Sequence, residues 1–85
     1  MNQSYTASQR LHLARVKALP CSVCDAAPPS QAHHVKQSLP YSCVALCPEC
    51  HMGSYLGWHG QRRAWTIRKM DEVDALCVTL KRLLK

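Results

Sequence analysis

Residues 21–51 read CSVCDAAPPSQAHHVKQSLPYSCVALCPECH and contain two Cys-x-x-Cys pairs, Cys21–Cys24 and Cys47–Cys50, with 22 residues between them. Two residues between the cysteines of a pair let both thiolates reach one tetrahedral ion, and a second pair completes a four-cysteine set. The connecting segment is slightly longer than usual, which costs little because loop-closure entropy grows slowly with length. Two disulfides are the alternative. The spacing predicts a structural zinc site made by Cys21, Cys24, Cys47 and Cys50, with no open position for a substrate.

The whole chain has 85 residues, with six Cys, five His and no Phe. A domain this small buries too little apolar surface to be stable without a metal or a similar constraint. The length also excludes a two-domain enzyme with its own cofactor domain. We therefore predict a flexible N-terminus over residues 1–7 and a single zinc-binding domain over residues 8–85.

Short elements follow from the local sequence. We predict a helix over Ser8–Leu19, with Ser8 as its N-cap and Pro20 ending it. Ala32–Val35 and Cys43–Leu46 are expected as short strands, and a turn or helix start is expected at Pro48. A further helix is predicted over Gln61–Met70. The fold class is α+β: a small zinc-stapled domain with a two-stranded hairpin and flanking helices.

The last helix has the clearest pattern. Asp71 is a good N-cap, and acidic residues follow in the first turn, where the helix dipole favours them. We predict a helix over Asp71–Leu84. Cys77 lies on the apolar face of this helix and is expected to be a core residue. The apolar residues of that face recur at helical spacing: Val73, Leu76, Cys77, Leu80 and Leu84. The other cysteine outside the zinc set, Cys43, is also expected to point inward.

Four histidines lie between and after the cysteine pairs. His33 and His34 are adjacent, and on an extended segment they must point to opposite sides. One of them could bind a metal together with His51 and His59, while the other acts as a general base. The alternatives are a histidine-rich surface, or a histidine that replaces one cysteine of the zinc site.

The chain is basic, with a formal charge of +6. A small basic domain favours nucleic acid or another polyanion as partner, although a merely solvated surface is the alternative. Trp58 and Trp65 could stack on a base or a sugar, or could belong to the core. Four basic residues follow His59 and are expected to lie along a phosphate backbone: Arg62, Arg63, Arg68 and Lys69.

The sequence contains no apolar run of the ~18 residues needed to span a membrane. The first residues also lack a basic-then-apolar signal pattern. We therefore expect a cytoplasmic protein with no membrane partner. In that reducing compartment, paired cysteines are metal ligands more often than disulfides.

The order of these motifs resembles the HNH nucleases, also called ββα-metal or His-Me finger nucleases. The matching stretches are the first Cys-x-x-Cys pair, the His-His-aliphatic triplet within Ala32–Val35, and Leu46–His51. The continuation GWHGQRRAW, residues 57–65, is similar to small phage and prophage HNH proteins of the recombination-nuclease type. The resemblance runs from about residue 19 to about residue 83 and implies a hairpin followed by a helix around a catalytic metal ion.

The resemblance also implies roles for single residues. His34, directly before the aliphatic residue, matches the general base that activates water. His33 and His51 match ligands of the catalytic divalent ion, and His59 is the choice for the third ligand. The Asn in the middle of the family motif is absent, because the only Asn of the chain is Asn2. Ser42, five residues before Cys47, stands at about that place, and its hydroxyl can replace the amide only in part.

The resemblance therefore implies a metal-dependent endonuclease that hydrolyses phosphodiester bonds in DNA with little sequence specificity. Its cofactors are the structural Zn²⁺ and a second divalent ion: Zn, Ni, Mn or Mg. Three imidazole ligands favour a transition metal over Mg²⁺. One alternative is a non-catalytic zinc module that binds nucleic acid, and another is a protein-interaction domain. A homodimer and a recombination partner both stay open, and a phage-encoded protein would work in the host cytoplasm.

Overall fold

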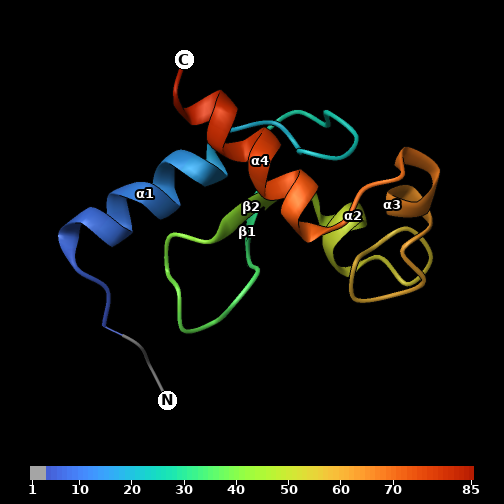
Figure 1. The fold of residues 1–85 in the computed structure, drawn as a ribbon, viewed down its shortest axis with the longest axis horizontal. Coiled ribbons are helices and arrows are strands. Elements are labelled where there is room, and N and C mark those ends of the chain that lie inside the picture. Colours follow the sequence, from blue (N-terminus) through green and yellow to red (C-terminus); the bar gives the residue numbers. More distant parts are fainter. Residues whose placement is uncertain (1–3) are drawn as a thin grey trace.

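The computed structural model describes residues 4–85, and a short antiparallel hairpin lies at its centre. Strand β1 (Gln31–His34) pairs with β2 (Cys43–Leu46), so that His33 lies opposite Val44 and His34 lies opposite Cys43. The helices are α1 (Ala7–Lys17), α2 (Pro48–Met52), α3 (Arg63–Arg68) and α4 (Glu72–Leu83). Figure 1 shows this arrangement, which confirms the α+β class with one two-stranded sheet.

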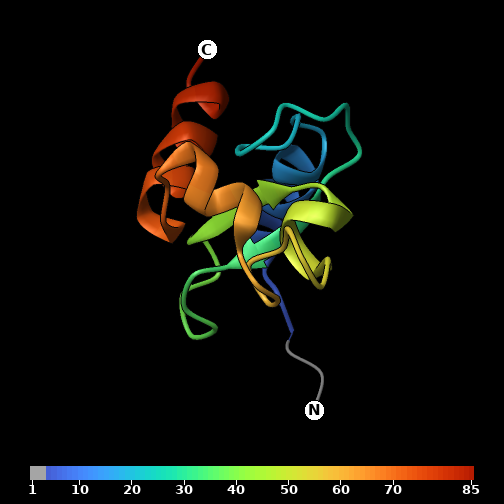
Figure 2. The same ribbon diagram turned by 90° about the vertical axis from the view of Figure 1, so that its right-hand side faces the viewer.

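All four residues of β2 are buried, because both faces of the strand are covered. Val44 and Leu46 pack with Trp65, Ala75 of α4 and three cysteines of the Cys-x-x-Cys pairs. Cys43 and Ala45 pack on the other face with Val16 of α1. Cys43 is therefore a core residue, as predicted. Figure 2 shows the strands from the side, with α4 along one side of them.

Helix α1 begins slightly earlier than predicted. Its N-cap is Thr6 rather than Ser8: the hydroxyl of Thr6 accepts the backbone N–H of Gln9 at 3.1 Å, and the Gln9 side chain accepts the N–H of Thr6 at 2.9 Å. This reciprocal pair satisfies two N–H groups, whereas a cap at Ser8 would leave them open. Of the predicted flexible N-terminus, residues 1–3 lie outside the described residues.

Helix α4 has the predicted N-cap at Asp71 but presents a different face to the core. Ala75 and Thr79 are buried, while Val73, Cys77, Leu80 and Leu84 are exposed. The prediction that Cys77 is a core residue is wrong, and Leu76 of the same apolar face is only partly buried. The small residues decide the orientation because they let α4 approach β2 closely. The Thr79 hydroxyl accepts the N–H of Ala45 at 3.3 Å and lies 2.7 Å from the Ser22 hydroxyl.

Helix α3 is shorter than the predicted helix over Gln61–Met70. It is bounded by Arg62 and Lys69, which both adopt left-handed backbone conformations. The N–H groups of Gln61 and Arg62 bond instead to Ser54 and Gly57, inside the preceding loop. Trp65 is buried, and its indole N–H donates to the carbonyl of Cys50 at 2.9 Å. Trp65 is therefore a core residue and not a surface for stacking bases.

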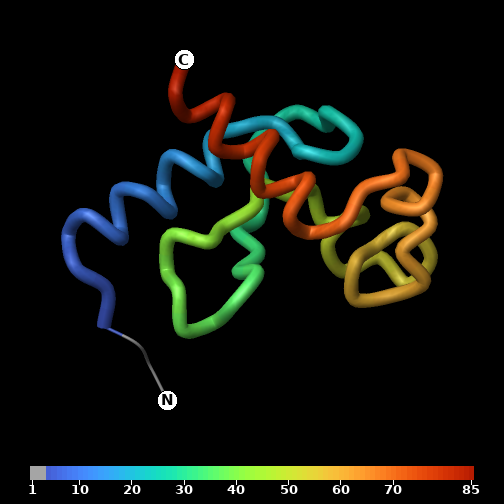
Figure 3. Tube along the Cα trace, viewed as in Figure 1, coloured from blue at the N-terminus to red at the C-terminus, as the bar shows by residue number. Residues whose placement is uncertain are grey.

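Loops join these elements, as Figure 3 shows, and residues 18–30, which carry the first Cys-x-x-Cys pair, join α1 to β1. The loop over residues 35–42 joins the strands, and the loop over residues 53–62 returns from α2 to α3. Within residues 4–85, no helix has the length and apolar character required to cross a membrane.

Candidate metal centres

The four predicted cysteines come together in one cluster. Their sulfur atoms all lie within 4.8 Å of one another, and all but Cys24 are buried. The sulfurs of Cys24 and Cys47 are 3.7 Å apart. That distance is far too long for a disulfide, whose sulfurs are about 2.05 Å apart. It is close to the edge of about 3.8 Å expected for a tetrahedron of thiolates at about 2.3 Å from zinc. The cluster could therefore hold a structural metal ion such as zinc.

The protonation of these thiols also favours a bound cation. Burial alone would raise the pKa of Cys21, but N–H groups of Cys47, Cys24 and Val23 point at its sulfur and lower the pKa overall. Burial, followed by the charge on Cys21, raises the pKa of Cys50 far above its ordinary value. Burial therefore disfavours a thiolate at Cys50 beside Cys21 unless a positive charge compensates it. A bound zinc ion would supply that charge and would keep the coordinating thiols deprotonated.

Three histidines form a second cluster next to the first. His33 comes from β1, His51 from α2 and His59 from the loop after α2. Their ring centroids are 5.1, 5.2 and 5.1 Å apart, so the rings stand at the corners of a nearly equilateral triangle. Nδ1 of His33 lies 3.3 Å from Nε2 of His51. That separation matches the edge of about 3.3 Å expected for nitrogens at about 2.0–2.1 Å from zinc.

The first cluster positions the second. His51 directly follows Cys50 in α2, and the loop then folds back so that the N–H of His59 bonds to the carbonyl of His51 at 3.1 Å. Gly57 permits this close return, because a Cβ there would lie 2.6 Å from backbone atoms of Gly53. A metal bound by the cysteines would therefore also hold two of the three histidines in place.

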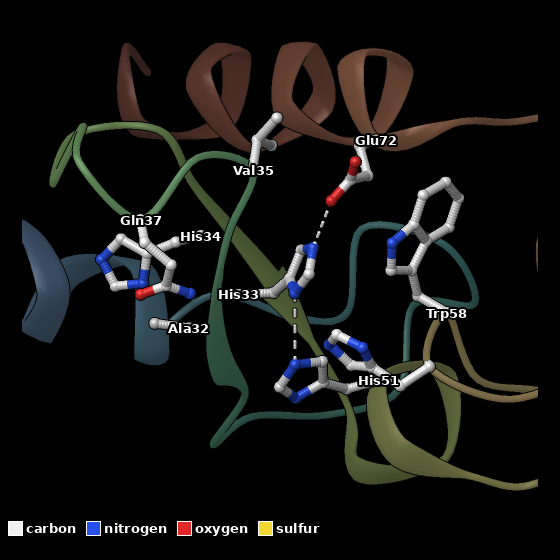
Figure 4. A pocket seen from close by; sticks show the side chains of 9 residues that line it. Ala32, His33, His34, Val35, Gln37, His51, Trp58 and Glu72 are labelled. Carbon is white, nitrogen blue, oxygen red and sulfur yellow. Dashed lines mark hydrogen bonds and ion pairs between the residues drawn. The ribbon is translucent and has the colours of Figure 1, made fainter.

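The nitrogens that face away from the triangle also have partners. Nε2 of His33 lies 2.5 Å from Oε2 of Glu72, and Nδ1 of His51 lies 2.7 Å from Oε1 of Gln31. Figure 4 shows His33 between Glu72 and His51. Burial, and then the nearby His33 and His59, lower the pKa of His51 to about 4. His51 is therefore neutral at pH 7, as a metal ligand must be.

His34 lies across β1 from His33, as strand alternation predicts. Its ring is parallel to that of Tyr5, with centroids 6.4 Å apart. Its Nε2 is buried and has no hydrogen-bond partner among residues 4–85. Burial lowers the pKa of His34, and the nearby His33 and His12 lower it further.

Ser42 closes the loop that follows His34. Its hydroxyl donates to the carbonyl of Leu39 at 2.7 Å and also bonds the backbone of Lys36. Its own carbonyl accepts the N–H of Val35 at 2.8 Å. Ser42 therefore ties both ends of the loop together, directly beside the residue that follows His34.

One cavity of about 330 Å³ is lined both by the three-histidine cluster and by His34. Its walls include the three clustered histidines, His34, Trp58 and Glu72.

The four predicted basic residues are all exposed. Arg62 lies over the ring of Trp58, 3.7 Å from its centroid, and donates to the Trp58 carbonyl. Arg63 lies 5.7 Å from the ring of Tyr55. The Arg62 guanidinium covers one face of the Trp58 ring. Arg68 and Lys69 lie at the C-terminal end of α3.

The partners of the histidines could not be found from the sequence. Glu72 appeared there only as an acid in the first turn of a helix, and Gln31 carried no signal.

Comparisons of the chain with protein-family models, with curated proteins and with solved structures gave no match.

Proposed function

We propose that this protein is a metal-dependent endonuclease of the HNH type. The observation that carries the proposal is the convergence of His33, His51 and His59 in one cavity that His34 also lines. The order β1, β2, α2 around these histidines supports it, because the resemblance implies a hairpin followed by a helix. The four cysteines would hold the structural zinc, and the three histidines would hold the second divalent ion.

Different residues of the chain would have different roles in hydrolysis. A divalent ion at the three histidines would neutralise charge on the phosphate and stabilise the leaving 3′ oxygen. His34, in its neutral form, would take the proton from the water that attacks phosphorus in line. Ser42 would keep the loop after His34 in place and so aim the His34 ring, in place of the missing Asn.

The proposal is tested by incubating supercoiled plasmid with the protein at low salt and Mg²⁺, Mn²⁺, Ni²⁺ or Zn²⁺. Nicking that depends on the added ion and stops with chelator would support it. No nicking with any of the four ions would contradict it.

A second candidate is a zinc module that binds nucleic acid without cutting it. The position of His34 favours this candidate, because its ring faces away from the three-histidine cluster. A gel shift of the plasmid without nicking would select this second function.

Replacing Ser42 with Asn is expected to maintain or raise cleavage. An amide can make the same contacts to the loop backbone as the hydroxyl and offers one more donor. Ser42→Ala, which removes the bonds to Lys36 and Leu39, is expected to lower the cleavage rate. Initial nicking rates at equal zinc content measure both effects. A large loss in Ser42→Asn would show that Ser42 does not stand in for the Asn.

Arg68 and Lys69 are expected to contact DNA phosphates. Changing both to Gln should weaken DNA binding and reduce the slope of log K against log salt by about 2, since each phosphate contact contributes about 0.9. Fluorescence anisotropy of a duplex over a salt series measures the slope. The matched control is Arg10→Gln with Arg15→Gln on α1, which removes the same charge elsewhere. Equal slopes for the two double variants would contradict this surface assignment.

A further inference from the structure

The outward nitrogens of two clustered histidines both meet hydrogen-bond acceptors. A neutral imidazole has one N–H and one lone pair, so an acceptor on one nitrogen turns the lone pair of the other nitrogen toward a metal. Glu72 is the acceptor at Nε2 of His33, and Gln31 is the acceptor at Nδ1 of His51. The two nitrogens without such an acceptor are Nδ1 of His33 and Nε2 of His51, which lie 3.3 Å apart inside the triangle.

The direction of the Glu72 side chain is not explained by helix capping. Asp71 and Asp74 make both reciprocal bonds at the start of α4. Glu72 makes neither of these bonds and reaches β1 instead, 39 positions away in the chain. It is also one of only five acidic residues in a chain of charge +6. An acid in the first turn would gain from the helix dipole while facing solvent, so the dipole does not account for this contact.

The contact is also well shielded from water. His33 is 6% exposed and Glu72 is 23% exposed. A hydrogen bond between an imidazole and a carboxylate is stronger in such surroundings than on an open surface. By contrast, Gln31 is exposed and uncharged, so its effect on His51 should be the smaller of the two.

We propose that Glu72 is a positioning residue for the three-histidine metal site. It accepts the Nε2–H of His33, holds the ring with Nδ1 toward the ion, and makes that nitrogen a stronger ligand. Gln31 orients His51 in the same way without adding charge. This inference rests on the metal site of the proposed function, but it does not require that DNA is cut.

The expected size of the effect follows from other metal sites. Removing the outer partner of a ligand histidine typically lowers metal affinity by about 10–100-fold. Glu72→Ala should fall in that range. Glu72→Gln keeps an acceptor of the same length without its charge and should lose less. Gln31→Ala should lose less than Glu72→Ala.

The test uses the full chain with one equivalent of Zn²⁺ to occupy the four cysteines, followed by calorimetric titration with Ni²⁺. Wild type should bind one further ion, His33→Ala should bind none, and Glu72→Ala should bind about 10–100-fold more weakly than wild type. The matched control is Glu49→Gln, an exposed acid on the helix that carries His51, which should bind as wild type does. Thermal midpoints of the zinc-loaded variants, measured before Ni²⁺ is added, separate metal affinity from folding.

The outcomes distinguish this inference from the proposed function. Equal Ni²⁺ affinity of wild type and Glu72→Ala would overturn the positioning role and leave the nuclease proposal standing. Weaker binding by Glu72→Ala, in a protein that nicks no plasmid, would support the positioning role while the nuclease proposal fails. No Ni²⁺ binding by wild type would overturn both.

Discussion

Cys24→Ser is expected to release zinc and unfold the domain. Structural zinc contributes about 10–16 kcal/mol in small zinc-dependent folds, as much as or more than the ~5–15 kcal/mol that separates folded from unfolded states in typical domains. Cys24 is exposed, so the change from sulfur to oxygen leaves no cavity in the core. Any loss of structure would therefore report the loss of a metal ligand. Zinc content and the dispersion of amide signals in an NMR spectrum measure the two effects together.

The matched control is Cys77→Ser, which makes the same chemical change at an exposed cysteine outside the cluster. This variant should keep its zinc and its wild-type unfolding midpoint. A folded Cys24→Ser protein with the stability of wild type would contradict the structural role of the four-cysteine site.

His34→Ala is expected to reduce cleavage by about 10²–10⁴-fold, the usual contribution of a general base. Metal content and DNA affinity should stay close to wild type, because His34 faces away from the three-histidine cluster. The matched control is His12→Ala, which removes a histidine near His34 whose Nε2 also has no partner among the described residues. Cleavage by His34→Ala at the wild-type rate would show that another group activates the water.

The pH dependence gives an independent check on the same residue. Only neutral His34 can accept a proton, so cleavage should rise as pH increases through its pKa. Burial, and then the nearby His33 and His12, lower that pKa from the ordinary value of an imidazole. The rising limb should therefore lie at lower pH than the titration of a free imidazole. The pH dependence is measured from initial cleavage rates between pH 4.5 and 8 at saturating metal. Folding is checked at each pH.

Several features of the fold could be predicted because their causes are local. The spacing of the Cys-x-x-Cys pairs lets both sulfurs of each pair reach one ion, and the structure brings all four sulfurs together. Strand alternation separates His33 from His34, whichever elements cover the sheet. Asp71 caps α4 through bonds to residues within one turn.

The buried face of α4 could not be read in the same way. Its larger apolar residues suggested one face, but Ala75 and Thr79 lie against β2. A helical pattern shows which residues share a side, whereas the partner surface decides which side is covered. Here the close approach to β2 and the hydrogen bond to Ala45 favour small residues and a hydroxyl.

The sequence by itself therefore determined the four-cysteine site, the two strands and the opposite directions of His33 and His34. The sequence also grouped His33, His51 and His59, but only the tertiary structure decided that Glu72 and Gln31 lie behind two of these histidines. Cysteine spacing and strand alternation act over a few residues, so they are visible in the order of the chain. The contact between Glu72 and His33 depends on how α4 packs across the sheet, and no local pattern records that placement.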